Sequence, residues 1–302
     1  MRNQKIRTFY KKEMALNDIV AENYSMSPNK PKLFMDHVEK KDKKDLLIVD
    51  EDFDPFSRED FYIAHTKEYV DAFFDNIPNL NVSNKLKWTP EFADTVRYTN
   101  SSLYAAIKHS IDYPDIVSLS PTAGFHHAMP HRGFDFCTFS GQVIASAKIY
   151  QQYKLAGAYI DLDAHFGNSI GDSMNFVKDL DKAIVMNINP EDYHDWYIKN
   201  LNRDLKILEN KILNKEVDYL VFAHGADSTE DDDLGDGQLT DKGWVRVSEI
   251  VYNFINEIDL KLGRPIPLTL SLFGGYRRHD FDSVLDLHLT DIEKCHSILC
   301  KN

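Results

Sequence analysis

Residues 156–165 read Ala-Gly-Ala-Tyr-Ile-Asp-Leu-Asp-Ala-His, an apolar run that ends in acidic residues and a histidine. We predict that residues 156–162 form a buried β-strand, because near-continuous apolar runs of this length are typical of strands covered on both faces. Asp163 and His165 are two residues apart, so in extended backbone their side chains point to the same side. A pair of metal ligands at the end of a buried strand explains this pattern better than a solvated loop does.

Similar apolar runs alternate with stretches of helical spacing along most of the chain. We predict further strands at residues 115–120, 183–188, 217–223 and 267–273, and helices at residues 61–74, 140–155, 196–213 and 240–262. Loops are expected at residues 25–32 and 76–90. This alternation indicates an α/β fold of three layers, α/β/α, around a central and mainly parallel sheet. We find no break in composition, so we expect one catalytic domain over residues 1–302.

Composition narrows the possible functions. The 302 residues are 43% hydrophobic, enough for a sizeable core, and carry a net charge of −13. This charge disfavours a nucleic-acid binder; it is compatible with a cationic substrate, although ordinary solubility explains it as well. We find no apolar stretch long enough to predict a membrane-spanning helix and no apolar segment that predicts a secretory signal. Three cysteines without CxxC spacing favour a reducing compartment, which we take to be the cytoplasm, and disfavour a cysteine-built zinc site.

Ligand-type residues also follow three other predicted strands. They are His126 and His127 after residues 115–120, Asp227 after residues 217–223, and Gly274-Gly275-Tyr276 after residues 267–273. In parallel sheets, sites form outside the carboxyl ends of the strands, so these residues should meet Asp161, Asp163 and His165. Each piece alone is weak, since a His-His pair is commonly a packing feature and Gly-Gly-Tyr a turn. Their joint occurrence at strand ends favours a functional site.

The chemistry of this set is that of a hydrolase. Two carboxylates and one imidazole suit a catalytic zinc ion, which keeps open positions for water and substrate. Zinc lowers the pKa of bound water to about 7 and polarises a carbonyl group. One neighbouring histidine can take the proton of the water, and a second can protonate a leaving amine. A tyrosine hydroxyl can donate to the developing oxyanion.

In their order along the chain, these motifs resemble those of the arginase/deacetylase superfamily, on its histone deacetylase and acetylpolyamine amidohydrolase side. The resemblance runs from about residue 25 to residue 276 and is clear from about residue 98. It implies a sheet of about eight strands and a deacetylase acting on an acylated amine. It also implies these roles: Asp163, His165 and Asp227 as zinc ligands, His126 and His127 as the acid/base pair, Tyr276 as the carbonyl-polarising residue, and Asp161 as the carboxylate that orients His126.

The same resemblance implies a narrow substrate tunnel and a second ion. Phe136 lines one wall of the tunnel, and Gly274 and Gly275 are expected to border it. The opposite wall is unassigned, with Tyr193 as a candidate. The backbone of Asp161 is expected to border a potassium ion.

Some positions depart from the usual pattern. Asn168 stands where many members have an Asp that pairs with the second active-site histidine, so His127 should be neutral at pH 7 more of the time. Phe166 replaces a further histidine, and Asp135 replaces the glycine before the tunnel phenylalanine. Asn187 stands where a potassium-binding hydroxyl is usual, which weakens the expectation of a potassium ion.

Several alternatives stay open at this point. The two-manganese chemistry of the arginase branch needs carboxylates at positions that Gly167 and Thr229 occupy here, so a one-metal site is favoured. The substrate is an acetylated protein lysine, an acetylated polyamine or another small acyl amide, and a catalytically silent binding protein is the remaining alternative. The oligomeric state is not predicted. We interpret the other histidines and the acidic run at residues 231–233 as packing or surface features, though the run could attract a cationic substrate.

Overall fold

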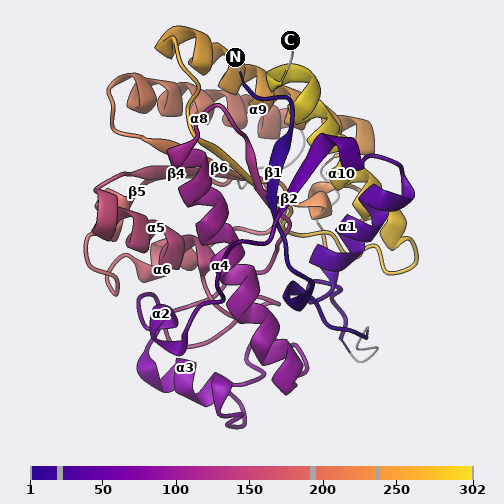
Figure 1. The fold of residues 1–302 in the computed structure, drawn as a ribbon, viewed down its shortest axis with the longest axis vertical. Helices are drawn as coiled ribbons and strands as arrows, with labels where there is room; N and C mark the ends of the chain where they lie inside the picture. Colours follow the sequence, from indigo (N-terminus) through magenta and orange to yellow (C-terminus); the bar gives the residue numbers. More distant parts are fainter. Residues whose placement is uncertain (1, 19–22, 191–194, 236–238, 301–302) are drawn as a thin grey trace.

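Seven parallel strands form the central layer of the part of the chain that the computed structural model describes, residues 2–18, 23–190, 195–235 and 239–300 (Figure 1). Their order in the sheet is β2-β1-β3-β7-β6-β4-β5. The strands are β1 (Ile6–Phe9), β2 (Leu47–Asp50), β3 (Ser118–Ser120), β4 (Gly157–Asp161), β5 (Ile184–Ile188), β6 (Tyr219–Ala223) and β7 (Leu268–Ser271). The three-layer α/β fold is therefore as predicted, with seven strands described where about eight were expected.

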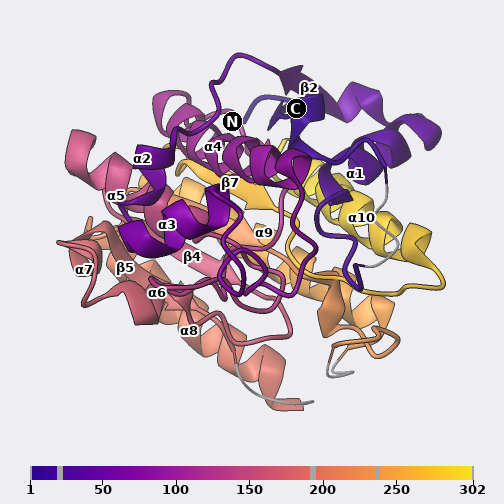
Figure 2. The same ribbon diagram turned by 90° about the horizontal axis from the view of Figure 1, so that it is seen from below.

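Helices cover both faces of this sheet. One face packs against α1 (Lys30–Lys40), α8 (Asp195–Leu213), α9 (Asp241–Leu262) and α10 (Phe281–Leu299). The other packs against α4 (Pro90–Asp112), α5 (Gly141–Tyr153), α6 (Ser169–Ser173) and α7 (Leu180–Ala183), while α2 (Arg58–Phe61) and α3 (Lys67–Phe74) join the same core below the strands in Figure 1. Figures 1 and 2 show these two sets of helices on opposite sides of the strands.

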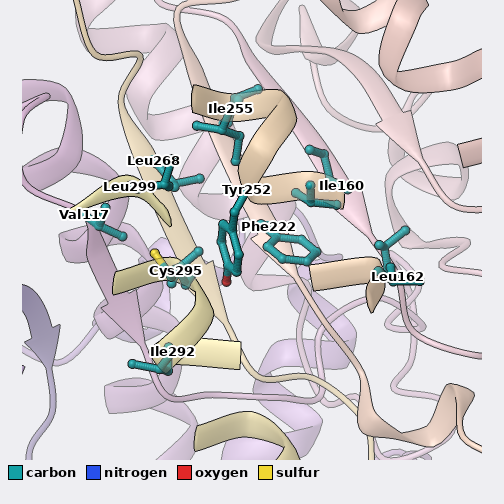
Figure 3. Close-up of a cluster of buried hydrophobic side chains, with 14 of the residues drawn as sticks. Val117, Ile160, Leu162, Phe222, Tyr252, Ile255, Leu268, Ile292, Cys295 and Leu299 are labelled. Carbon is teal, nitrogen blue, oxygen red and sulfur yellow. The ribbon is translucent and has the colours of Figure 1, made fainter. Parts of the chain in front are cut away.

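The alternation of side chains along each strand builds two separate cores. Ile160 of β4 belongs to the core under α8 to α10, whereas its neighbour Tyr159 belongs to the core under α4 and α5. In the first core, Phe222 of β6 packs edge-on against Tyr252 of α9 (Figure 3). Each large apolar side chain buried in this way contributes roughly 1.5–3 kcal/mol. The sheet is thereby held rigidly, which fixes the positions of the strand ends.

The strands and helices predicted beyond residue 100 are confirmed to within a few residues, but the first part of the chain was predicted poorly. The helix predicted over residues 61–74 is wrong as a single element, since Thr66 begins α3 by accepting a hydrogen bond from the Tyr69 amide. The loop predicted over residues 25–32 ends too late, because α1 begins at Lys30 with Pro31 in its first turn. The edge strand β2, its neighbour β1 and the helices α4 and α10 were not predicted.

Two expectations from the composition can be compared with the structure. Among the described helices, none is long and apolar enough to cross a bilayer. Cys137, Cys295 and Cys300 are all buried as free thiols. Free thiols agree with a reducing compartment, although the compartment itself stays a prediction.

Candidate active site

The four strands that carry the predicted site residues are consecutive neighbours in the sheet, in the order β3, β7, β6 and β4. The residues in question are His126 and His127 beyond β3, Tyr276 beyond β7, Asp227 beyond β6, and Asp161, Asp163 and His165 at the end of β4. Because all four strands are parallel, their carboxyl ends lie on one edge of the sheet. Segments up to 150 residues apart in sequence therefore meet there.

Asp163, His165 and Asp227 form a compact group of potential metal ligands. Each offers one donor atom, and these atoms lie within 4.8 Å of one another. The Nδ1 atom of His165 lies 3.1 Å from Asp163 Oδ1 and 3.0 Å from Asp227 Oδ2. Both carboxylates are buried. The described residues contain no second group of this kind, and the number of metal ions stays a prediction.

The electrostatics of this group favour a bound cation. Burial and the nearby charge of Asp163 raise the pKa of Asp227 to about 7. The hydrogen bonds of His165 to Asp163 and Asp227 raise the pKa of its imidazole to about 11. Two buried carboxylates this close together can both be ionised only when positive charge lies nearby. Two oxygen donors and one nitrogen donor therefore fit a divalent cation that keeps open coordination positions.

Backbone groups hold the two carboxylates in place. The amide of Ala164 donates to Asp227 Oδ1 at 3.2 Å, and the amide of Gly274 donates to Asp163 Oδ2 at 2.9 Å. A Cβ atom at Gly274 would overlap Asp227 Oδ2 and lie 2.6 Å from Asp163 Oδ2, so only glycine fits here. Gly275 has a φ of +133° and packs against Val284. The structure thus places Gly274 directly against both carboxylates and Gly275 against Val284 and Ala226.

His126 and His127 lie side by side, with their ring centroids 4.1 Å apart. The Nδ1 atom of His126 lies 3.0 Å from Asp161 Oδ2, a contact that places Asp161 where it can orient the His126 ring. The Nδ1 atom of His127 lies 2.9 Å from Asn168 Oδ1. Asn168 in turn donates from Nδ2 to Asp172 at 2.6 Å, which fixes which way its amide points. Because both Nδ1 atoms have these partners, the Nε2 atom of each ring is the one that can interact with other groups in the site.

Their surroundings drive the two imidazoles apart in pKa. Burial lowers the pKa of His126, but the charges of Asp163 and Asp161 outweigh burial and raise it to about 9. Burial and the positive charge of His126 lower the pKa of His127 to about 4, against a small opposing effect of the Asn168 hydrogen bond. The neighbouring carboxylates therefore favour the charged form of His126, whereas burial favours the neutral form of His127. Neighbouring groups with pKa values pushed apart are typical of an acid/base pair.

A cavity of about 250 Å³ opens onto these groups. The residues that line it are Lys85, His127, Asp135, Phe136, His165, Leu234 and Tyr276. The rings of Phe136 and Tyr276 lie 5.7 Å apart at its wall, and Tyr276 lies 6.3 Å from His165. Gly274 and Gly275, which we expected to border the tunnel, are not among the described residues that line this cavity. His127, His165 and Tyr276 thus share one cavity that has an aromatic wall.

Comparison with known proteins decides the family. The family model for the histone deacetylase domain matches residues 24–189, which is more than half of the chain. This protein belongs to the histone deacetylase family. The match includes the histidine pair and the first two metal-ligand candidates, whereas Asp227 and Tyr276 lie beyond it.

The fold of this deacetylase-family chain is also found among solved structures. The crystal structure of the HDA15 HD domain superposes with a TM-score of 0.71 over 99% of this chain and 90% of that chain. Only 14% of the residues are identical, so the likeness establishes the fold alone. The superposition extends beyond the region of the family match and includes the strand ends that carry Asp227 and Tyr276.

An uncommon turn presents the aromatic wall of the cavity. Phe134 and Cys137 exchange two backbone hydrogen bonds, of 2.9 and 2.8 Å, across Asp135 and Phe136. Asp135 has a φ of +36° and Phe136 a φ of +64°. Positive φ at both central residues favours glycine, asparagine or aspartate, so Asp135 is tolerated where the family usually has glycine. The Asp135 carboxylate pairs with Lys85 on the cavity wall.

Several residues of this deacetylase site were missed in the sequence. Leu234 lines the cavity, and its carbonyl lies 3.1 Å from His165 Nε2. Lys30 is fully buried, and its Nζ donates to the Phe273 carbonyl at 2.5 Å. Asp232 lies in the run that we interpreted as solvated, yet it accepts a hydrogen bond from the Tyr276 amide at 2.6 Å. That interpretation is therefore wrong for Asp232, and no local pattern signals these long-range contacts.

Two expectations from the resemblance gain no support. The carbonyl of Asp161, expected to border a potassium ion, accepts a hydrogen bond from Asn189 Nδ2 at 3.0 Å. The Asn187 side-chain oxygen is buried without a hydrogen-bond partner. Tyr193, the candidate for the second tunnel wall, lies outside the described residues. Within the described part of the chain, Leu234 and Tyr276 line the cavity with Phe136.

Proposed function

We propose that this protein is a zinc-dependent deacetylase that hydrolyses the amide of an acetylated or otherwise acylated amine, such as acetyl-lysine. The observation that carries the proposal is the convergence of Asp163, His165 and Asp227 beside a cavity that His127 and Tyr276 line. This arrangement joins a metal-binding group, a proton acceptor and an oxyanion donor in one site. Membership of the histone deacetylase family supports the same reaction.

The ligand set supports one zinc ion. When bound, zinc would polarise the amide carbonyl and lower the pKa of a water molecule. Gly167 and Thr229 stand where bridging carboxylates for a second metal would be needed. A Cβ atom at Gly167 would lie 2.6 Å from Asp161 Oδ2, and the buried Thr229 hydroxyl donates to a backbone carbonyl and accepts from Arg277. Neither position contributes a metal ligand.

His127 is the residue that we propose to move the proton. Asn168 Oδ1 accepts the proton on Nδ1, which leaves the Nε2 lone pair free at neutral pH. Burial and the charge of His126 lower the pKa of His127, so the ring is neutral and its Nε2 atom can accept a proton from an attacking water molecule. The charged neighbour His126 makes the imidazolium of His127 a strong acid, which favours passing the proton on to the leaving amine.

His126 and Tyr276 stabilise developing negative charge in this proposal. Asp161 accepts a hydrogen bond from His126 Nδ1 and so orients the imidazole. Burial, together with the charges of Asp163 and Asp227, raises the pKa of the Tyr276 phenol well above its usual range. The hydroxyl therefore stays a donor at all working pH values and can hydrogen-bond the oxyanion that forms from the amide carbonyl.

The substrate class is proposed at the level of an acylated amine on an unbranched chain. Acetyl-lysine and acetylated polyamines both place an amide at the end of a flexible alkyl chain, which suits a narrow cavity beside an aromatic wall. We favour acetyl-lysine and keep acetylpolyamine or another small acyl amide as the alternative. Neither nucleic acid nor a membrane is a proposed partner.

A screen of acylated substrates on zinc-loaded protein tests this proposal, with acyl length and amine varied independently. We expect release of the acid, and a loss of about 10²–10³-fold in kcat for Tyr276→Phe, as when one oxyanion donor is removed. His127→Ala should lose at least as much. Tyr113→Phe, at an exposed position, is the matched control. Stoichiometric zinc without turnover of any acylated amine would favour a binding protein, and near-wild-type rates in Tyr276→Phe would contradict the mechanism.

A further inference from the structure

Asp232 makes an unusual set of contacts for a residue in an acidic surface loop. Its Oδ1 atom accepts hydrogen bonds from the amides of Leu234 and Gly235, both at 3.0 Å. Its Oδ2 atom accepts from the amide of Tyr276 at 2.6 Å, across 44 residues of sequence. Both carboxylate oxygens are therefore engaged by backbone donors, and the two sets of donors belong to different segments of the site.

The first set of contacts reaches the metal-ligand group. By capping the amides of Leu234 and Gly235, Asp232 shapes the loop between Asp227 and Gly235. The Leu234 carbonyl in this loop lies 3.1 Å from Nε2 of His165, whose other nitrogen faces the two carboxylates. The partner of the outer nitrogen sets the tautomer and orientation of a ligand histidine.

The second set of contacts reaches the oxyanion donor. Tyr276 ends a turn in which Phe273 has a φ of +57° and Gly275 a φ of +133°. Lys30 holds the start of this turn through the Phe273 carbonyl, and Asp232 holds its end through the Tyr276 amide. A buried cation and a carboxylate thus fix the two ends of the segment that carries the tyrosine.

We propose that Asp232 is a positioning residue that sets Tyr276 relative to the metal-ligand group. The proposal rests on the proposed deacetylase function. The Asp232 side chain joins the two segments directly, so it determines where the Tyr276 hydroxyl lies when the amide carbonyl reacts. A misplacement of about 1 Å in such a group can lower a rate 10²-fold.

Two variants separate this role from ordinary loop stability. Asp232→Ser keeps a short oxygen for the Leu234 and Gly235 amides but lacks the reach to Tyr276. Asp232→Ala removes all three hydrogen bonds. Asp231→Ala is the matched control, since Asp231 is an exposed neighbour of the same charge.

We expect Asp232→Ser to lower kcat on an acetyl-lysine peptide by about 10–100-fold, with KM within threefold and zinc affinity unchanged. Asp232→Ala should show the same loss of kcat and, in addition, bind zinc about 10–100-fold more weakly in a competition with a chromogenic chelator. In a Tyr276→Phe background, Asp232→Ser should cost less than twofold, because its effect passes through the tyrosine hydroxyl. Asp231→Ala should match the wild type throughout.

The positioning role is overturned if Asp232→Ser keeps wild-type kcat, or if its loss multiplies with that of Tyr276→Phe. Circular dichroism and thermal melts check that each variant folds, and if Asp232→Ala does not, the Ser variant and its double variant still decide. Should the wild type itself hydrolyse no acylated amine, the proposed function fails. The loop contact is then judged separately, by the zinc affinity of Asp232→Ala against Asp231→Ala, where equal affinities would contradict it.

Discussion

Replacing Asn168 by aspartate tests the proton-transfer role of His127. Asn168 Oδ1 lies 2.9 Å from His127 Nδ1, so a carboxylate at this position would face the imidazole directly. Asn168 also donates to Asp172, and Asn168→Asp alone would set two carboxylates against each other. The double variant Asn168→Asp with Asp172→Asn exchanges the two groups and keeps a donor between them. It is the cleaner perturbation.

The size of the effect follows from the geometry. The pKa of His127 lies near 4 because burial and the charge of His126 disfavour its protonated form. An opposite charge within hydrogen-bonding distance raises a pKa by roughly 1–3 units. The pKa of His127 should therefore move to about 5–7. At the upper end of this range, about half of the molecules would carry a protonated His127 at pH 7 and could not accept a proton.

The assay is the pH dependence of kcat/KM on an acetyl-lysine peptide between pH 4 and pH 9, which reports groups of the free enzyme. We expect the acidic limb of the double variant to lie about 1–3 pH units above that of the wild type. Asp172→Asn alone is the control for the loss of the exposed charge. Zinc content measured at each pH separates protonation of His127 from loss of the metal.

An acidic limb that moves by less than about 0.3 pH unit in the folded, zinc-loaded double variant would refute this reasoning. It would mean that the proton acceptor is not His127, or that Asn168 does not control it. A shift of the same size in Asp172→Asn would point instead to a general effect of surface charge.

Two further predictions concern metal binding and stability. Gly274→Ala should weaken zinc binding at least about tenfold, because the new methyl group overlaps the Asp227 carboxylate. The control is Gly171→Ala, which has open space around its Cβ position and should bind zinc as the wild type does. Equal zinc affinities of the two variants would contradict the close approach of Gly274 to the carboxylate. His65 is buried between a backbone carbonyl and a backbone amide, and burial lowers its pKa to about 4. In the unfolded chain His65 binds a proton near pH 6.5, so the free energy of unfolding should fall by up to ~3 kcal/mol between pH 6.5 and pH 4. Urea unfolding measured over that window should show a weaker fall for His65→Gln than for the wild type.

The predictable part of the fold was the part whose strands are buried on both faces. β4, β6 and β7 are buried along their full length and mostly apolar, and their pattern differs clearly from that of the amphipathic helices around them. β1 and β2 are four residues long and lie at one side of the sheet, and neither shows a regular alternation of polar and apolar residues. Such short segments give no distinct periodicity, so their pairing depends on tertiary contacts that a single sequence does not reveal.

The residues of the site likewise divide into those that the sequence predicts and those that it does not. Asp163, His165 and Asp227 could be predicted because the ends of parallel strands must share one edge. Lys30 could not, because a lysine at the start of a helix is ordinarily solvated, and its burial here depends on the turn at Phe273. Asp232 was misread for a similar reason, since an acidic run is usually a solvated one. Predicting contacts of this kind requires the path of both segments in space.

The proposed function depends above all on one metal ion, which Asp163, His165 and Asp227 bind and which supports hydrolysis of an acylated amine. Titration of metal-free protein with zinc, with acid release from an acetyl-lysine peptide measured at each step, tests this most directly. We predict that the rate rises in proportion to bound zinc and reaches a plateau at one equivalent per chain, and that Asp227→Ala shows neither tight binding nor turnover. A rate that needs two equivalents, or a fully loaded protein that releases no acid from any acylated amine, would contradict the account.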